Sequence, residues 1–232
     1  MDDSRALFAS STRTAERVSA FLTKVYGWMF IGLGITAAVA YLIASSPALT
    51  SVLMANRLVF FALVLAELGL VFFLSARVQS LEPGTAAGLF VAYAALNGVT
   101  LSLILLIYTG ASIATTFIVT GAMFGALAAY GTATSRSLAG AGQFFFMGLV
   151  GLVLASIVGM FWPSDTLQFL ITIVGVIVFT GLTAWDAQRL KQMALTLPEG
   201  QAGAYAVVGA LSLYLNFVNL FLMLLRLQGR RE

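Results

Sequence analysis

The sequence predicts an all-α integral membrane protein with about seven transmembrane helices, and three observations support this prediction. Hydrophobic residues make up 60% of the 232 residues, and the mean hydropathy is +1.00. Only 12 Lys or Arg and 9 Asp or Glu residues are present. A soluble fold of this size lacks the interior to hide so much apolar surface, so most of the chain must face lipid. Apolar runs of spanning length repeat along the chain, without the alternation of outer-membrane barrel strands.

Residues 1–24 form a polar N-terminal segment that precedes a single transmembrane domain, residues 25–232. Within this segment Val18, Phe21 and Leu22 recur at helical spacing, which predicts a short amphipathic helix at the membrane interface. The apolar run behind it is about 20 residues long, more than the core of a signal peptide, and its charged prefix is long. We therefore expect an uncleaved first span.

Seven apolar runs follow, separated by breaks that contain Pro, Gly or Ser. We place the spans at residues 25–45, 58–76, 85–107, 111–132, 143–162, 167–186 and 204–226. Most Lys and Arg residues fall on one side of the membrane if the N-terminus is cytoplasmic, and the positive-inside rule favours that orientation. Seven full spans then place Arg226, Arg230 and Arg231 outside. A re-entrant last segment would keep them inside, but the length of 204–226 favours a full span.

The composition excludes several classes of chemistry. The chain has no His and no Cys, which excludes zinc sites, thiol catalysis, disulfides and Ser-His-Asp triads. A retinal protein needs a lysine inside a span, whereas Lys24 and Lys191 lie at span ends. An intramembrane aspartyl protease needs two facing aspartates, and Asp186 alone lies near a span. We therefore expect no enzyme activity and no cofactor. The cations are too few and dispersed for a nucleic-acid partner.

Three charged residues lie within or at the ends of spans, where ionisable groups are costly and are candidates for function. Glu67 lies mid-span, about 13 Å from either side at helical rise, and predicts a buried pair or a functional group. Asp186 ends the sixth span; the alternative is an interfacial carboxylate paired with Arg189. Arg226 closes the seventh span; the alternative is a side chain that snorkels to the headgroups.

Small and uncharged polar residues inside the spans predict close helix packing. The chain has 22 glycines, and Gly121 and Gly125 form a GxxxG motif, which lets helix backbones approach. Asn97 lies in the third span, and Asn216 and Asn219 lie in the seventh. Amides at such positions are more often helix-packing groups than ligands.

Two stretches carry a resemblance to a known family. AWDAQRLK ends the sixth span, and ALSLYLNFVNLFLMLLRL forms the seventh. Together with Glu67 in the second span, they resemble the transmembrane Bax-inhibitor-motif family, in its bacterial YccA-like branch, from about residue 15 onward. The resemblance implies a fold in which the last helix is central and the other six wrap it. It also implies a calcium-permeable leak of the bacterial inner membrane that responds to pH.

The resemblance further implies roles for four residues. In the family, two aspartates share a proton and latch the pore. The first falls at Asp186 and the second at Asn216, because LYLDF reads LYLNF here. The family also has an acidic residue in the second span and an arginine that ends the seventh span. These match Glu67 and Arg226, which would form a buried pair or line an ion path. Asp186 and Glu67 are then the expected ligands for transient calcium. Asp186 can meet Asn216 only if the sixth helix runs deeper than residue 186.

The function expected from these residues is a pH-responsive cation leak of the inner membrane, with calcium permeation. Its partners would be membrane lipid and calcium or other cations. An alternative of a different class is a membrane partner, regulator and substrate of the membrane-anchored AAA protease in protein quality control. The polar N-terminal segment is the feature that such a protease would grip.

Overall fold

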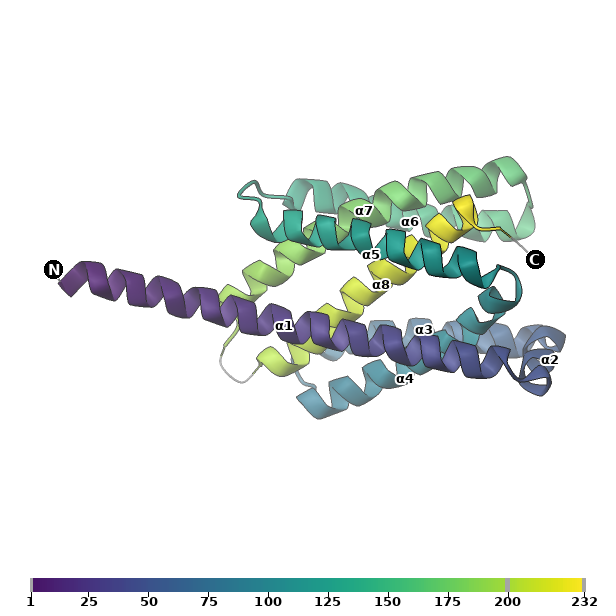
Figure 1. The fold of residues 1–232 in the computed structure, drawn as a ribbon, viewed down its shortest axis with the longest axis horizontal. Coiled ribbons are helices and arrows are strands. Elements are labelled where there is room, and N and C mark those ends of the chain that lie inside the picture. Colours follow the sequence, from purple (N-terminus) through teal and green to yellow (C-terminus); the bar gives the residue numbers. More distant parts are fainter. Residues whose placement is uncertain (1, 199–200, 231–232) are drawn as a thin grey trace. The chain divides into compact units, whose positions relative to one another are not determined.

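The computed structural model describes residues 2–198 and 201–230, which are helical throughout apart from short connections (Figure 1). The elements are α1 (Asp2–Ala44), α2 (Pro47–Ala55), α3 (Arg57–Arg77), α4 (Pro83–Leu101), the 3₁₀ helix η1 (Ser102–Leu106), α5 (Gly110–Ala133), α6 (Ala139–Phe161), α7 (Asp165–Thr196) and α8 (Ala202–Gln228). Seven helices of this described part are long and apolar enough to cross a membrane, the third of them continuing through η1. The prediction of an all-α, seven-span membrane protein is confirmed.

Two helices are longer than their predicted spans. The amphipathic segment and the first span form one helix, α1, and residues 2–24 contain no Pro or Gly to interrupt it. Helix α7 continues ten residues beyond Asp186 to Thr196 and stops just before Pro198. Residues 187–196 are mostly good helix formers and include Arg189 and Lys191, so the apolar run ends before the helix does. The drop in hydropathy therefore predicts where a helix leaves the lipid, and it does not predict where the helix ends.

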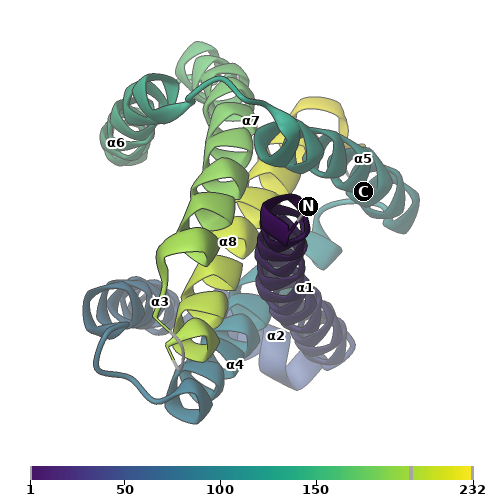
Figure 2. The same cartoon turned by 90° about the vertical axis from the view of Figure 1, so that its left-hand side faces the viewer.

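The chain divides into two compact units. The first unit comprises Met1–Leu101 with Arg189–Leu211. In it α1 lies along α4, as the views in Figures 1 and 2 agree. The Thr36 hydroxyl donates a 2.8 Å hydrogen bond to the carbonyl of Ala94. A Cβ atom on Gly98 would lie 2.8 Å from the Thr36 carbonyl oxygen, so glycine permits this close approach.

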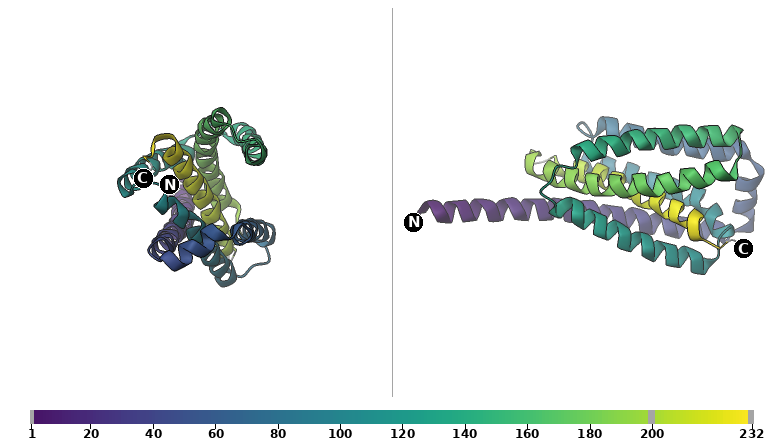
Figure 3. Two further views of the ribbon diagram at one scale, coloured as in Figure 1. Left: turned by 90° about the vertical axis from the view of Figure 1, so that its right-hand side faces the viewer. Right: turned by 90° about the horizontal axis from the view of Figure 1, so that it is seen from above.

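The second unit comprises Ser102–Gln188 with Ser212–Glu232. Its α6 and α7 are joined by a short turn and run antiparallel, as the right-hand view of Figure 3 shows. Their apolar faces pack together with the second half of α8 in one cluster, made by Leu152, Ile171, Val178, Phe179, Leu182, Leu220 and Leu224. The end of the described chain is fixed to the start of α5, because Arg230 accepts from the Thr109 N–H and donates to the Ser112 hydroxyl.

Helix α8 is the most buried of the seven candidate spans. Its most apolar window is 61% buried, against 44% for α7 and 33% or less for the others. It contributes its first half to the first unit and its second half to the second unit. This burial is what a central last helix requires, and its wrapping by the other six helices stays a prediction.

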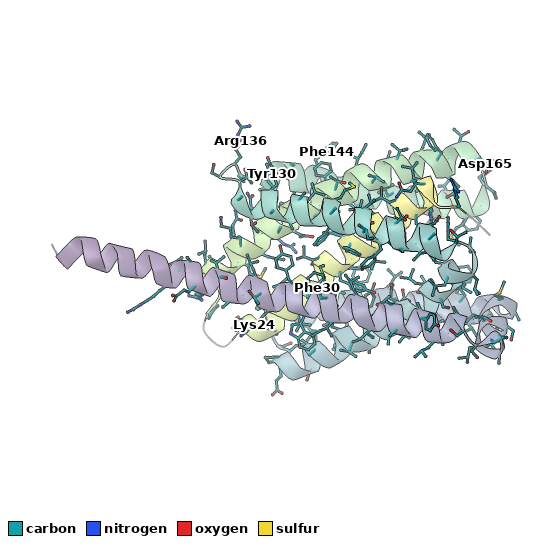
Figure 4. All side chains as sticks on the ribbon, viewed as in Figure 1. Lys24, Phe30, Tyr130, Arg136, Phe144 and Asp165 are labelled. Carbon is teal, nitrogen blue, oxygen red and sulfur yellow. The ribbon has the colours of Figure 1, made fainter. Side chains whose placement is uncertain are left out.

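Large apolar side chains cover the outer faces of the helices. Phe30 on α1 and Phe144 on α6 are 66% and 73% exposed and point away from their helices (Figure 4). In water such surfaces would promote aggregation, whereas in a bilayer they face acyl chains. The exposed apolar surface therefore agrees with a membrane environment.

Candidate functional site

Asp186 and Asn216 meet inside the second unit. The side-chain amide of Asn216 donates a 2.8 Å hydrogen bond to Asp186 Oδ2. Both side chains are buried, 6% and 5% exposed. The contact exists because α7 continues to Thr196, so that Asp186 lies about 15 Å inside the helix end at 1.5 Å per residue. The structure thus brings together the two residues that the resemblance assigned to a latch. It does not place Asp186 as an exposed interfacial carboxylate.

Two glycines hold α7 close to its neighbours beside this pair. A Cβ on Gly131 of α5 would collide with the backbone carbonyl of Ala184 in α7. A Cβ on Gly142 of α6 would collide with the indole ring of Trp185. The residues directly before Asp186 are therefore packed against both α5 and α6 at distances that only glycine allows.

The side chain of Gln188 connects α7 to the loop between α5 and α6. Its amide Nε2 donates a 2.9 Å hydrogen bond to the carbonyl of Arg136, and its Oε1 accepts a 2.8 Å bond from the N–H of Leu138. Gln188 is 6% exposed. Since its amide bonds the loop backbone at two points, it fixes the loop against α7 two residues after Asp186. We name this contact the Gln188 clamp.

A second polar cluster lies in the first unit, around Glu67 at the midpoint of α3. The Thr100 hydroxyl lies 2.9 Å from Oε1, and the Asn97 amide donates to Oε2 over 3.3 Å. The same amide lies 3.5 Å from the Tyr93 hydroxyl. Residues 93, 97 and 100 share one face of α4 because they are four and three positions apart. Glu67 therefore has neutral hydrogen-bond donors from the next helix.

Arg226 lies exposed in the last turn of α8, within the second unit. It lines a pocket of about 490 Å³ with the polar side chains of Tyr108, Asp165, Gln168 and Thr172. Glu67 belongs to the first unit. The buried pair or common ion path of Glu67 and Arg226 therefore stays a prediction. The structure gives each of them polar neighbours of its own.

The sequence matches a known protein family. Residues 18–232 match the model of the family described as inhibitor of apoptosis-promoting Bax1. The chain belongs to this family. It is 48% identical over 215 residues to the inner membrane protein YbhL of Escherichia coli strain K12, covering 91% of this chain and 92% of that protein. An uncharacterized protein of Deinococcus radiodurans is 41% identical over 221 residues, covering 95% and 94% of the two chains. An uncharacterized membrane protein of Streptococcus pyogenes serotype M3 is 35% identical over 224 residues, covering 95% and 97%.

The acidic residues of this Bax-inhibitor family member are not clustered. Among residues 2–198 and 201–230, no group of three or more Asp, Glu, His or Cys could hold a metal ion. Asp186 and Glu67 belong to different units, and each supplies a single carboxylate. Their assignment as ligands of transient calcium stays a prediction.

Two contacts of this family member were not predicted from the sequence, and one predicted contact is absent from the described structure. The Gln188 clamp depends on where the loop between α5 and α6 lies, which the sequence does not specify. The one indication in the sequence is a polar residue, Gln188, in the stretch that ends the sixth span. The partners of Glu67 are Asn97 and Thr100, polar residues of a span joined to α3 by a short loop. The expected close packing at the GxxxG motif is wrong for the described structure. A Cβ on Gly121 or Gly125 would meet nothing within 4 Å.

Proposed function

We propose that this protein is a cation leak channel of the bacterial inner membrane, permeable to calcium and responsive to pH, with its gate at Asp186 and Asn216. The observation that carries the proposal is the buried hydrogen bond between these two side chains, which joins α7 to the most buried span, α8. The family match supports the proposal, and the printed name of the Escherichia coli relative supports the inner membrane as its location.

The chemistry of the pair suits a gate for a hard cation. A buried carboxylate is costly unless a donor or a cation satisfies it. In the closed state the Asn216 amide donates to Oδ2 of Asp186. When the two helices separate, the carboxylate and the amide oxygen become ligands of the type that calcium prefers. Opening therefore exchanges an amide donor for a permeating cation.

The surroundings of the pair indicate where the helices separate. The segment of α7 around Asp186 is held by Gly131, Gly142 and the Gln188 clamp. Asn216 sits on α8, whose far end is held as well, because Gln228 donates to the Thr116 hydroxyl and the Arg230 N–H donates to the Ser112 hydroxyl of α5. We therefore expect opening to separate α8 from α7 locally at Asn216 rather than by a shift of the whole helix.

Glu67 supplies a second set of oxygen atoms for the cation. It lies halfway along α3, half-buried, with the Thr100 hydroxyl and the Asn97 amide beside its carboxylate. Carboxylates at mid-membrane depth mark ion pathways more often than lipid-facing surfaces. In the proposed channel Glu67 is a transient cation site, distinct from the gate.

The test is calcium entry into dye-loaded liposomes that contain the purified protein, measured from pH 5 to pH 8. We expect influx above that of protein-free liposomes, with a rate that changes with pH. Asp186→Asn removes the one titratable group of the pair and is expected to abolish the pH response. Asp165→Asn, at the opposite end of α7, is the matched control and is expected to keep it. Influx that equals the protein-free rate at every pH would exclude the channel.

A second candidate is the regulator and substrate of a membrane-anchored AAA protease. The observation that favours it is the N-terminal extension of α1, which begins at Asp2, before the apolar run that starts at residue 25. Deletion of residues 2–14 should abolish degradation by such a protease and leave calcium flux unchanged. Degradation at the wild-type rate after this deletion would argue against this candidate.

A further inference from the structure

A groove of about 820 Å³ lies between the early part of α1 and the last turns of α7, within the first unit. Its α1 wall covers residues 14–26, about 18 Å of helix at 1.5 Å per residue. The volume is in the range of small-ligand sites. The residues that line it are Thr14, Ala15, Val18, Ser19, Leu22, Thr23 and Tyr26 from α1, and Lys191 and Leu195 from α7.

The lining combines one cation, four hydroxyl groups and an apolar strip. Lys191 is the charged residue of the lining, and no acidic side chain is among the lining residues. The hydroxyls come from Thr, Ser and Tyr side chains of α1, and the apolar strip includes Val18 and Leu22. A ligand that fits this lining has an anionic, oxygen-rich head and an apolar tail.

The charges around the groove favour an anion as well. Arg13, Arg17 and Lys24 lie on the same stretch of α1, against Glu16 as the one acidic residue between them; Lys24 extends from α1 in Figure 4. The Arg17 guanidinium donates to the carbonyl of Leu197, just after α7. This contact ties the two walls of the groove together, so the groove is a built feature of the first unit.

The depth of the groove matches that of lipid headgroups. The apolar run of α1 begins at residue 25, so Leu22, Thr23 and Tyr26 lie at its start and the rest of the lining lies on the headgroup side. With a cytoplasmic N-terminus this end faces the cytoplasmic leaflet, whose anionic lipids are attracted to basic residues near the membrane.

We propose that this groove binds an anionic glycerophospholipid of the cytoplasmic leaflet. The Lys191 ammonium and the Ser19 and Thr23 hydroxyls hold the phosphate. One acyl chain lies along Leu22 and Tyr26, toward the apolar run that begins at residue 25. The bound lipid contacts both α1 and the end of α7, and it joins the two helices at their membrane boundary.

The test measures lipid binding to the full-length purified protein by native mass spectrometry, with phosphatidylglycerol and with phosphatidylcholine. Lys191→Gln is expected to weaken phosphatidylglycerol binding about tenfold, the loss expected for one charge-assisted contact. Arg77→Gln is the matched control, since Arg77 is an exposed cation in the last turn of α3 and does not line the groove. It is expected to change binding less than twofold. Ser19→Ala with Thr23→Val is expected to weaken binding without removing a charge.

Three results would overturn the proposal. One is equal phosphatidylglycerol binding by wild type and Lys191→Gln. Another is equal binding of phosphatidylglycerol and phosphatidylcholine, which would show that the anionic head is not recognised. The third is competition by millimolar inorganic phosphate that removes the lipid completely, which would assign the groove to free phosphate.

Discussion

Asn216 of α8 donates a 2.8 Å hydrogen bond to the carboxylate of Asp186 of α7, although the two residues are thirty positions apart. The pair has one titratable member, because position 216 carries an amide where a carboxylate would share a proton. Asparagine is nearly isosteric with a protonated aspartic acid but cannot release a proton. Replacing Asn216 by Asp therefore adds a titratable group at this contact with little change in packing.

Asn216→Asp is expected to add a pH-dependent step to calcium flux between about pH 6 and pH 8, because contacting carboxylates titrate as a coupled pair over several pH units. Below this range the pair holds one proton and the contact stays closed. Above it two like charges face each other in a low dielectric, so flux should rise with pH. Liposomal calcium flux measured against pH checks this prediction.

Two further variants isolate the coupling at position 216. Asn219→Asp is the matched control, since Asn219 is on the same helix and donates to Leu215 of its own helix. It is expected to leave the flux profile of the wild type unchanged. Asp186→Asn combined with Asn216→Asp should remove the added step. A profile of Asn216→Asp that coincides with wild type would show that positions 186 and 216 are not coupled.

The Gln188 clamp is expected to stabilise the second unit. Gln188→Ala removes a donor and an acceptor and leaves the Arg136 carbonyl and the Leu138 N–H without them. Loss of buried partners costs about 1–3 kcal/mol of unfolding free energy. Gln188→Glu keeps an acceptor for the Leu138 N–H but turns a buried carboxylate oxygen toward the Arg136 carbonyl, so it is expected to cost at least as much as alanine. Denaturant unfolding in detergent measures both, and equal stability of all three proteins would contradict the clamp.

The sequence predicted the membrane fold because the composition and the lengths of the apolar runs depend on few details. It did not predict the end of α7, since hydropathy falls at Asp186 whereas helix-forming residues continue to Thr196. This difference of ten residues decides whether Asp186 can reach Asn216. Lipid contact is set by the hydropathy of the side chains, whereas helix length is set by their helix propensity.

The side-chain partners could not be predicted in the same way. Glu67, Asn97 and Thr100 were each visible as polar residues inside spans, but their contact depends on how α3 and α4 are rotated about their axes. Helices with polar residues at similar depth can face them toward or away from each other. The Asp186–Asn216 pair was expected from the family resemblance, and periodicity alone does not specify it.

Glu67→Gln and Arg226→Gln are expected to have additive effects on stability. Glu67 is bonded by Asn97 and Thr100, and Arg226 lines a pocket with Asp165. Independent sites usually add to within about 0.5 kcal/mol. A double mutant more stable than either single mutant would instead establish the buried pair, because each single change would leave one charge uncompensated. In the channel, Glu67→Gln should also lower calcium flux.

A reporter fused after the last residue is expected to lie outside the cytoplasm. Seven spans with a cytoplasmic N-terminus require this side, although Arg226 and Arg230 then lie outside. Figure 4 shows Arg136 and Asp165 at opposite ends of the second unit. Reporters after Arg136 and after Pro163 therefore serve as inside and outside references. A cytoplasmic signal at the C-terminus would reject the full seventh span.

Gly131→Ala is expected to disturb the gate through packing alone. The added methyl group would collide with the Ala184 carbonyl, and backbone atoms cannot yield as a flexible side chain can. Overpacking of this kind costs about 1–3 kcal/mol of unfolding free energy. Because Ala184 lies two residues before Asp186, α7 should shift at the Asn216 contact, and calcium flux under closed conditions should rise.

The matched control for this substitution lies on the same helix. Gly125 of α5 has open space where a Cβ would stand, and alanine is a better helix former than glycine by about 1 kcal/mol. Gly125→Ala should therefore leave stability unchanged or raise it slightly, with wild-type flux. Thermal unfolding in detergent and liposomal flux measure both variants. If Gly131→Ala matched Gly125→Ala in both measurements, the close contact of α5 with α7 would not be what positions Asp186.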